Sequence, residues 1–531
     1  MSNEKNIGKG FAILSLAGIL VKLISLLYVP ILSNILGEVA YGSYSIVYRI
    51  FSFIYIIANS GVPVAVSKHV SELSGKNYHV AALRSFKIAR SLLILLGFVL
   101  SIVMVIVAYT TKPEDEWMGI LVLAPCVFFT AILSAYRGYF QGRNYMTPTA
   151  STQIIEQIFN FGFSIGFAAV LMSQTQNTVL GVAGGSVGTS IGAFAALVII
   201  IIMFKKYSDR GLSVPADNIK SPYSYKELMR TLLKYSIPIT VCSAIQFGGD
   251  LIDALNVKDR LMASGLEEDM AKTLFGYLNK SQQLINVPIS LVIALTVAML
   301  PAISSSVAVN NMKKALQKIR YSFRLCYTVC VPLAFGLSVL HAGIYRVLRY
   351  DNGSEILLFA GLTILFLATV QIQTSILQSL GRLYYVMCSL SVGIIFKLAV
   401  NYYLVGLPSF RIYGAVIGTY VSMLVVVCIN QYLIKRENIR MRMVPVIWRP
   451  VAASIYMAAV SAVIYYIPQS LSNVFSGYAA NAVLLIVAAG AGAFTYFAIM
   501  AKLKGLTKDD IMSISGKIYS VLPGFMKRML S

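Results

Sequence analysis

Long apolar runs are the feature that most constrains this chain. Runs of about 20 residues rich in Leu, Ile, Val and Ala recur along its whole length, and one such run can cross the roughly 30 Å hydrocarbon core of a bilayer as a helix. A membrane-spanning barrel would instead need short strands of alternating polarity, so we expect helices. We count fourteen runs, within residues 10–36, 41–67, 91–110, 118–140, 151–172, 181–204, 231–256, 274–304, 324–348, 356–380, 386–405, 412–434, 448–468 and 477–501.

The composition excludes a water-soluble protein. Of the 531 residues, 57% are hydrophobic and only 12% are charged, whereas about a quarter are charged in a typical soluble domain. The mean hydropathy of +0.75 means that the apolar residues are too many to be hidden in soluble cores. We therefore predict an all-α polytopic membrane protein with fourteen transmembrane helices. The first run is too long for a signal peptide, so we expect it to be retained.

The formal net charge of +23 is divided unequally between the two sides of the membrane. With a cytoplasmic N-terminus, the termini and the loops on that side hold 32 of the 44 Lys and Arg residues, and the opposite loops hold six. The opposite loops also carry acidic clusters at 114–116 and 267–269. This asymmetry predicts that both termini are cytoplasmic. Anionic membrane lipids are sufficient partners for the basic rim, and we expect no nucleic acid partner because no nucleic-acid-binding motif is present.

Short patterns recur between the two halves of the chain at offsets of 230 to 239 residues. The matched positions are Pro63 with Pro301, Ala82-Leu83 with Ala315-Leu316, Gly142-Arg143 with Gly381-Arg382, and Gly188-Thr189 with Gly418-Thr419. They predict two parallel six-helix halves around a central cavity, with two further helices. The alternative is chance recurrence in Gly-rich membrane helices. The expected parts are an N-terminal lobe (1–204), a cytoplasmic linker (205–230), a C-terminal lobe (231–436), the last two helices (437–503) and a cytoplasmic tail (504–531).

Ionisable residues inside apolar runs are costly and by default face a polar cavity or one another. Lys22 lies in the middle of the first run, and Arg49 lies on a Tyr-rich face of the second. We predict that such cations, with nearby polar residues, bind an anionic substrate. The candidate set is Lys22, Arg49, Lys280, Gln282, Gln283, Glu156 and Asn160. The alternative is internal salt bridging, in which Lys22 or Arg49 pairs with a carboxylate of the seventh run.

Two carboxylates of the seventh run are candidates for coupling or gating. Asp250 and Asp253 are three residues apart, so they share one helix face, and two glycines directly before them could loosen the helix. Two like charges this close favour protonation of one, which suits proton coupling. They could equally line the outer mouth of the cavity. Glu156 and Asn160 form a polar stripe of the kind that lines water or packs on a neighbouring helix.

Other polar residues indicate neither catalysis nor a cofactor. Lys234 and Arg346 lie near the ends of runs, where long side chains reach the headgroups, so we assign them no site role. The three histidines are scattered, and no Gly-rich phosphate loop of the GxxxxGK type occurs. The six cysteines lie within apolar runs, where we expect small buried residues. We therefore expect no enzyme activity, no metal and no cofactor.

Several segments resemble a known family of membrane transporters. They are residues 9–10 (KG), 61–68 (GVPVAVSK), 136–142 (YRGYFQG), 146–150 (MTPTA) and 153–157 (QIIEQ). In these segments and from end to end, the chain resembles the multidrug/oligosaccharidyl-lipid/polysaccharide (MOP) exporter superfamily. Within it, the chain is similar to the polysaccharide-transport branch that includes stage V sporulation protein B and the MurJ-type lipid II flippases.

The resemblance implies a flippase of the bacterial cytoplasmic membrane. Its substrate would be an undecaprenyl-pyrophosphate-linked oligosaccharide, most plausibly the peptidoglycan precursor lipid II, moved by alternating access and driven by an ion gradient or membrane potential. The last two helices would hold the polyprenyl tail. We expect a monomer that acts in cell-wall synthesis, cell shape or sporulation and that meets cell-wall synthesis enzymes. The alternatives are a cation-coupled multidrug exporter of the same superfamily and a non-transporting scaffold for envelope synthesis.

The family's basic positions are matched only in part. They fall in this chain on Lys22, Tyr28, Tyr55 and Gln282 or Gln283. Arg49 lies about two helical turns from the position occupied by Tyr55, and Lys280 lies close to the two glutamines. The resemblance therefore implies an anion site whose composition differs from the family pattern.

Overall fold

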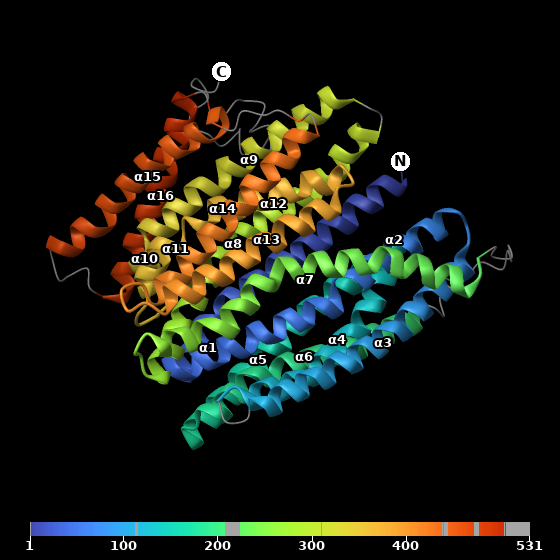
Figure 1. Cartoon of the computed structure of the whole chain (residues 1–531), viewed down its shortest axis with the longest axis horizontal. Helices are drawn as coiled ribbons and strands as arrows, with labels where there is room; N and C mark the ends of the chain where they lie inside the picture. The colour runs from blue at the N-terminus through green and yellow to red at the C-terminus, as the bar shows by residue number, and fades with distance from the viewer. Residues whose placement is uncertain are drawn as a thin grey trace. The chain divides into compact units, whose positions relative to one another are not determined.

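The described part of the chain is entirely helical in its regular structure (Figure 1). The computed structural model describes residues 2–111, 115–207, 223–308, 311–437, 439, 444–471, 477–503 and 505, and none of these residues is in a strand. The helices are α1 (Ser2–Asn59), α2 (Gly61–Gly75), α3 (His79–Thr110), α4 (Trp117–Gly142), α5 (Thr147–Thr175), α6 (Thr178–Tyr207), α7 (Tyr225–Ala263), α8 (Glu268–Ala308), α9 (Met312–Val339), α10 (His341–Val347), α11 (Ser354–Ala360), α12 (Thr363–Ser379), α13 (Leu383–Val405), α14 (Ile412–Arg436), α15 (Val444–Leu471) and α16 (Tyr478–Lys502). The predicted all-α class is confirmed.

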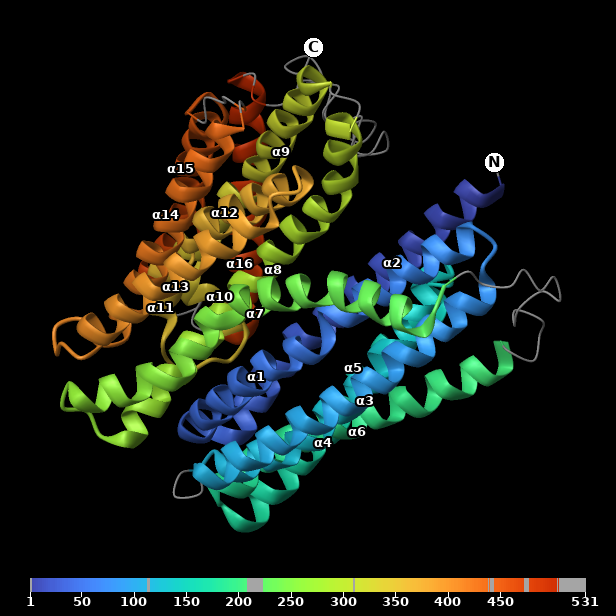
Figure 2. The same ribbon diagram turned by 45° about the vertical axis from the view of Figure 1, so that its right-hand side comes forward.

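The first two predicted spans form one continuous element that turns at a glycine. Within α1, Gly37 has φ 76° and ψ 174°, outside the helical region, and a positive φ of this kind is readily adopted only by glycine. In both views the chain turns back within α1, so that α2 lies at the same end as the N-terminus (Figure 1, Figure 2). A single residue therefore separates the first span from the second.

The helices are long and apolar enough for a polytopic membrane protein. Ten helices of the described residues pass a test of length and hydropathy for a membrane span, and the pair α11 and α12, bent by 44°, adds an eleventh. A total of fourteen also requires the second half of α1 and the two long helices α7 and α8, which have 39 and 41 residues. The structure is thus consistent with the fourteen predicted spans.

The described helices group into two compact units. The first contains residues 1–276 and 401–411, and the second contains 277–400 and 412–531. In the first unit, α3, α4, α5 and α6 lie side by side (Figure 1, Figure 2). A seam of glycines on α6 makes close packing possible, because a Cβ atom at Gly188 or Gly192 would come within 2.5 Å of an α5 carbonyl oxygen. Small residues four apart commonly let membrane helices approach in this way.

The second unit contains the last two helices of the chain. There α15 and α16 pack together and against α9 through Ala453, Met457 and Tyr496. The Tyr496 hydroxyl donates a hydrogen bond to the Thr328 carbonyl oxygen at 2.8 Å, which satisfies the one polar atom of this buried ring. The appended helices are therefore an integral part of this unit.

The predicted lobe boundaries and the duplication stay predictions. The grouping into units places α7 with the first six spans. Within the predicted linker, α6 continues to Tyr207 and α7 begins at Tyr225, where Ser224 and Glu227 form a capping box. Residues 208–222, and the predicted tail 504–531 except residue 505, lie outside the described residues.

Candidate functional site

A buried arginine on α1 pairs with two carboxylates on α7. Arg49 is 6% exposed, and its Nη1 lies 3.4 Å from both Asp250 Oδ1 and Asp253 Oδ2. The guanidinium also lies 5.3 Å from the centroid of the Phe275 ring. Of the two sequence-based alternatives for Arg49, the structure shows the internal salt bridge.

The two aspartates of this ionic cluster have unlike surroundings. Asp253 is buried and accepts a hydrogen bond from Asn401 Nδ2 at 2.8 Å, whereas the Asp250 side chain is 47% exposed. Arg49 Nε and Asn401 Oδ1 are buried and have no hydrogen-bond partner among the described residues. Asp250 is therefore the carboxylate of this cluster that solvent reaches. Arg49 Nε and Asn401 Oδ1 can bind a further polar group.

Two lysines were also candidates for the anion site. Lys22 lies on α1, is exposed, and forms no ion pair with a described residue, so the salt-bridge alternative does not hold for it. Lys280 lies in the second unit and is 2% exposed, with its ammonium 4.8 Å from the centroid of the Tyr350 ring. The neighbouring Gln282 and Gln283 are partly buried. Convergence of Lys22, Arg49 and Lys280 on one cavity stays a prediction.

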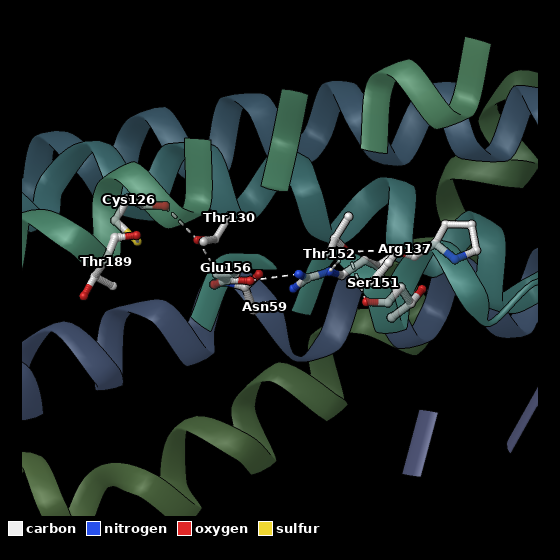
Figure 3. Close-up of polar contacts among 10 residues, drawn as sticks. Asn59, Cys126, Thr130, Arg137, Ser151, Thr152, Glu156 and Thr189 are labelled. Atoms are coloured by element: carbon white, nitrogen blue, oxygen red, sulfur yellow. Dashed lines mark hydrogen bonds and ion pairs between the residues drawn. The ribbon is translucent and has the colours of Figure 1, made fainter. Parts of the chain in front are cut away.

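A second ion pair, largely shielded from solvent, lies between α4 and α5 (Figure 3). Arg137 Nη2 lies 2.8 Å from Glu156 Oε2, and the two side chains are 12% and 14% exposed. Arg137 Nε also donates to Thr152 Oγ1 at 3.2 Å. Arg137 is one of the 32 basic residues counted on the cytoplasmic side, although the predicted run 118–140 includes it. The residue is inside α4, because the helix continues to Gly142.

Asn160 joins α5 to α6. Its Oδ1 accepts hydrogen bonds from Ser164 Oγ and Thr189 Oγ1, both at 3.0 Å. Gly188 of α6 lies against the Asn160 backbone, which brings the two helices close enough for these bonds. The polar stripe formed by Glu156 and Asn160 thus packs on neighbouring helices. Whether these residues also contact a substrate stays a prediction.

Two residues of these polar contacts, Arg137 and Asn401, were not predicted from the sequence. Arg137 was missed because it lies near the end of an apolar run, although Glu156 required a cationic partner somewhere in the interior. Asn401 was missed because a neutral amide in an apolar run gives no charge signal. The only available hint was its position in the eleventh run, four residues after the ionisable Lys397.

No metal site is evident in the described part of the chain. Within it, no group of three or more His, Cys, Asp or Glu side chains has an arrangement that could hold a metal ion. Four of the cysteines are buried as expected, but Cys388 and Cys428 are exposed. These two lie on apolar helices, so their exposure corrects the expectation that all six would be buried.

The fold and the buried ion pairs define a class of protein. Long apolar helices that enclose paired charges are typical of polytopic membrane transporters. The family described as polysaccharide biosynthesis protein matches residues 7–307 of this chain. The chain therefore belongs to the polysaccharide biosynthesis protein family.

Two curated relatives from Bacillus subtilis (strain 168) match the chain over nearly its whole length. The chain is 26% identical over 533 residues to the uncharacterized membrane protein YabM, covering 98% of this chain and 97% of YabM. It is 24% identical over 549 residues to the lipid II flippase MurJ, covering 98% of each chain.

Solved structures identify the fold. A lipid II flippase MurJ in an inward closed conformation is similar with a TM-score of 0.64 at 14% identity, over 91% of this chain and 98% of that chain. An inward-facing multidrug resistance transporter of the MATE family in the MOP superfamily gives a TM-score of 0.63 at 14% identity, over 79% of this chain and 94% of that chain. The fold is that of the MOP superfamily, as the sequence resemblance implied.

Proposed function

We propose that this protein is a flippase that moves an undecaprenyl-pyrophosphate-linked oligosaccharide, specifically lipid II, across the bacterial cytoplasmic membrane by alternating access. The observation that carries the proposal is the burial of Arg49 inside an apolar helix, with a half-exposed carboxylate as one of its partners. Membership of the polysaccharide biosynthesis family and the similarity to MurJ support the substrate class.

Arg49 would recognise the pyrophosphate by exchanging its carboxylate partners. A guanidinium binds phosphate oxygens through paired hydrogen bonds, and Arg49 Nε has no partner among the described residues. In the proposed cycle, protonation of Asp250 or binding of a cation there releases Arg49 toward the anionic substrate. Lys22 and Lys280 would add positive charge. Glu156, Asn160, Gln282 and Gln283 would contact the sugars or the peptide.

The pairing of both aspartates with Arg49 does not favour a drug exporter. A cation-coupled multidrug exporter should offer an acidic pocket without paired basic residues, since its substrates are cationic. Here one arginine contacts both carboxylates. A scaffold without transport would have no need for buried cations, which are costly in a membrane.

Proteoliposomes with fluorescent lipid II in one leaflet test the proposal. The wild-type protein should move lipid II to the opposite leaflet, and an Arg49→Ala/Lys22→Ala variant should lose at least about 90% of the rate because two cations of the proposed anion site are removed. Lys234→Ala is the matched control, since Lys234 is an exposed lysine on α7 that we assign no site role. Unimpaired flipping by the double variant would contradict the proposed anion site.

A panel of substrates tests the identity of the cargo. The same vesicles can be loaded with undecaprenyl-pyrophosphate carrying a different oligosaccharide, or with a cationic dye. Faster movement of the other glycolipid would show that it, and not lipid II, is the substrate. Movement of the dye alone would favour a multidrug exporter. The proposal also includes cytoplasmic termini, a monomeric state and contacts with cell-wall synthesis enzymes.

A further inference from the structure

A buried lysine at the start of α8 forms the centre of a second ionic cluster in the first unit. The Lys272 side chain is 4% exposed, and its Nζ lies 2.7 Å from Asp115 Oδ2 and 2.8 Å from Glu268 Oε1. Lys258, near the end of α7, lies 3.9 Å from the same Glu268 oxygen. By the predicted topology, all four residues are on the outer side of the membrane.

This cluster joins elements that are far apart in the sequence. Asp115 lies just before α4, whereas Lys272 and Glu268 lie in the first two turns of α8. The helix backbones also meet here, because a side chain at Gly42 of α1 would overlap the Lys272 carbonyl group. The predicted lobe boundary lies in the linker between α6 and α7, so the Asp115–Lys272 ion pair crosses it.

A second polar contact at the predicted outer side lies within the predicted second lobe. Arg260, at the end of α7, donates from Nε to the Tyr402 carbonyl oxygen at 2.9 Å, and its guanidinium lies 4.0 Å from the centroid of the Tyr402 ring. Tyr402 belongs to the segment 401–411 that groups with the first unit. The end of α7, the start of α8 and the segment 401–411 are thus joined to one another at the predicted outer side through polar contacts.

The other end of α7 is held differently. Near the predicted cytoplasmic side, Leu228 and Leu232 of α7 are buried in an apolar cluster with α2 and α3. Apolar contacts stabilise without direction, whereas each ion pair has a fixed partner and geometry. The Asp115 and Glu268 side chains are 31% and 44% exposed, so water can solvate them when the ion pairs break.

We propose that Lys272, Asp115 and Glu268 form an outer lock, a set of ion pairs that closes the outer side of the transporter and must break and re-form in each transport cycle. The inference rests on the proposed alternating-access function. The ion pairs of Lys272 would hold the outer side shut, and the acidic loops on that side would supply their carboxylates. Lys272 is the residue that both carboxylates share, so its loss breaks the two shortest ion pairs of the cluster together.

A reversible cross-link tests whether the lock must open. In a variant whose six native cysteines are replaced by alanine, the pair Asp115→Cys/Lys272→Cys should be joined by a bis-methanethiosulfonate cross-linker, whose span replaces the length of the two ionic side chains. Flipping of lipid II should then stop and return on reduction. The control pair is Ser74→Cys/Arg143→Cys, which joins α2 to α4 within the first predicted lobe, where Arg143 Nη1 lies 3.4 Å from Ser74 Oγ. This control should cross-link and still flip lipid II.

A second measurement needs no substrate, so it separates failure of the lock from failure of the proposed function. Ser43 is fully buried beside Gly42. A cysteine at Ser43→Cys should react slowly with a membrane-impermeant maleimide added outside intact cells. Adding Lys272→Gln should raise that rate about tenfold or more, because a buried ion pair is broken. Asp259→Asn, which changes an exposed charge on α7, should leave the rate unchanged.

Three results would overturn the lock. They are continued flipping by the cross-linked pair, no increase in labelling with Lys272→Gln, and labelling that occurs only from the cytoplasmic side in inverted vesicles. If labelling rises as expected while the uncross-linked wild-type protein moves no lipid II, the lock stands and the proposed substrate is wrong.

Discussion

Arg49 and Arg137 of the first unit form ion pairs that differ in almost every respect. Arg137 and Glu156 are 19 residues apart on neighbouring helices, with one positive charge facing one negative charge at 2.8 Å. Arg49 lies 201 and 204 residues from Asp250 and Asp253 and faces two negative charges at 3.4 Å. One of those partners is 47% exposed.

The difference indicates which pair is structural and which can change. A pair with short bonds and little exposure has nothing to gain from separation, so Arg137 and Glu156 should stay together throughout the proposed transport cycle. A cluster with one solvated carboxylate can exchange that partner for an incoming anion or proton at small cost. The sequence distance matters too, because the Arg49 cluster joins the second predicted span to α7, whereas Arg137 and Glu156 join consecutive helices.

The largest expected effect is on the stability of the α4–α5 pair. Replacing Arg137 by Ala leaves the Glu156 charge buried and unpaired, which should lower the free energy of unfolding by about 3–5 kcal/mol. The double variant Arg137→Met/Glu156→Gln removes both charges and should recover most of that loss. Denaturant unfolding in detergent measures both. A double variant as unstable as the single one would contradict a simple pair.

The two aspartates of the Arg49 cluster should respond unequally. Asp253→Asn removes a buried partner of Arg49 and weakens the hydrogen bond from Asn401, so we expect a loss of about 2–3 kcal/mol in unfolding free energy. Asp250→Asn should cost less than about 1 kcal/mol, because that side chain is half exposed and screened by solvent. The same unfolding assay measures both. Equal losses would show that the two carboxylates are not distinguished by burial.

Close packing beside Glu156 gives a smaller effect. A Cβ atom at Gly192 would come within 2.5 Å of the Glu156 carbonyl oxygen, so Gly192→Ala should cost about 1–3 kcal/mol through overpacking. Gly162→Ala on α5 is the matched control, since a Cβ atom there meets nothing within 4 Å. It should be neutral or stabilising by up to about 1 kcal/mol. The measurement is the shift in Tm, and a neutral Gly192→Ala would mean that α6 can move away from α5.

The smallest expected effect is that of pH on the outer lock. Burial lowers the pKa of Lys272, but hydrogen bonds to Asp115 and Glu268 outweigh burial and hold that pKa above its ordinary value. The hydrogen bond with Lys272 in turn lowers the pKa of Glu268. The lysine contribution is complete below its unfolded pKa of about 10.4, and the glutamate contribution is complete above its unfolded pKa of about 4.3.

The stability contributed by the lock should therefore be constant between these limits. The difference in Tm between the wild-type protein and Lys272→Gln should not change from about pH 6 to about pH 9. It should shrink only as the pH falls toward the lowered pKa of Glu268 or rises toward the raised pKa of Lys272. A difference that halves near neutral pH would mean that another titrating group controls the contact.

The spans could be predicted from the sequence, because hydrophobic length is a local property that the bilayer selects directly. Even the break at Gly37 falls in the gap between the first two predicted runs. The sequence predicted the ion pairs of Arg49 only as one of two alternatives, since a list of charged residues in apolar runs does not say which side chains are in contact. Arg137 was missed because a helix can continue beyond the end of its apolar run. Asn401 was missed because a neutral amide in an apolar run does not call for an ionic partner.

The turn at Gly37 has a consequence for biosynthesis. Lys22 and Arg49 lie on the two spans that this one residue separates, and each span alone brings a cation into hydrocarbon, where it is costly. With no loop between them, the translocon would receive both spans as one helical hairpin, and each can shield the polar groups of its neighbour before α7 has been made. A longer connection at residue 37 should then reduce the yield of inserted protein while leaving the finished contacts of Arg49 unchanged.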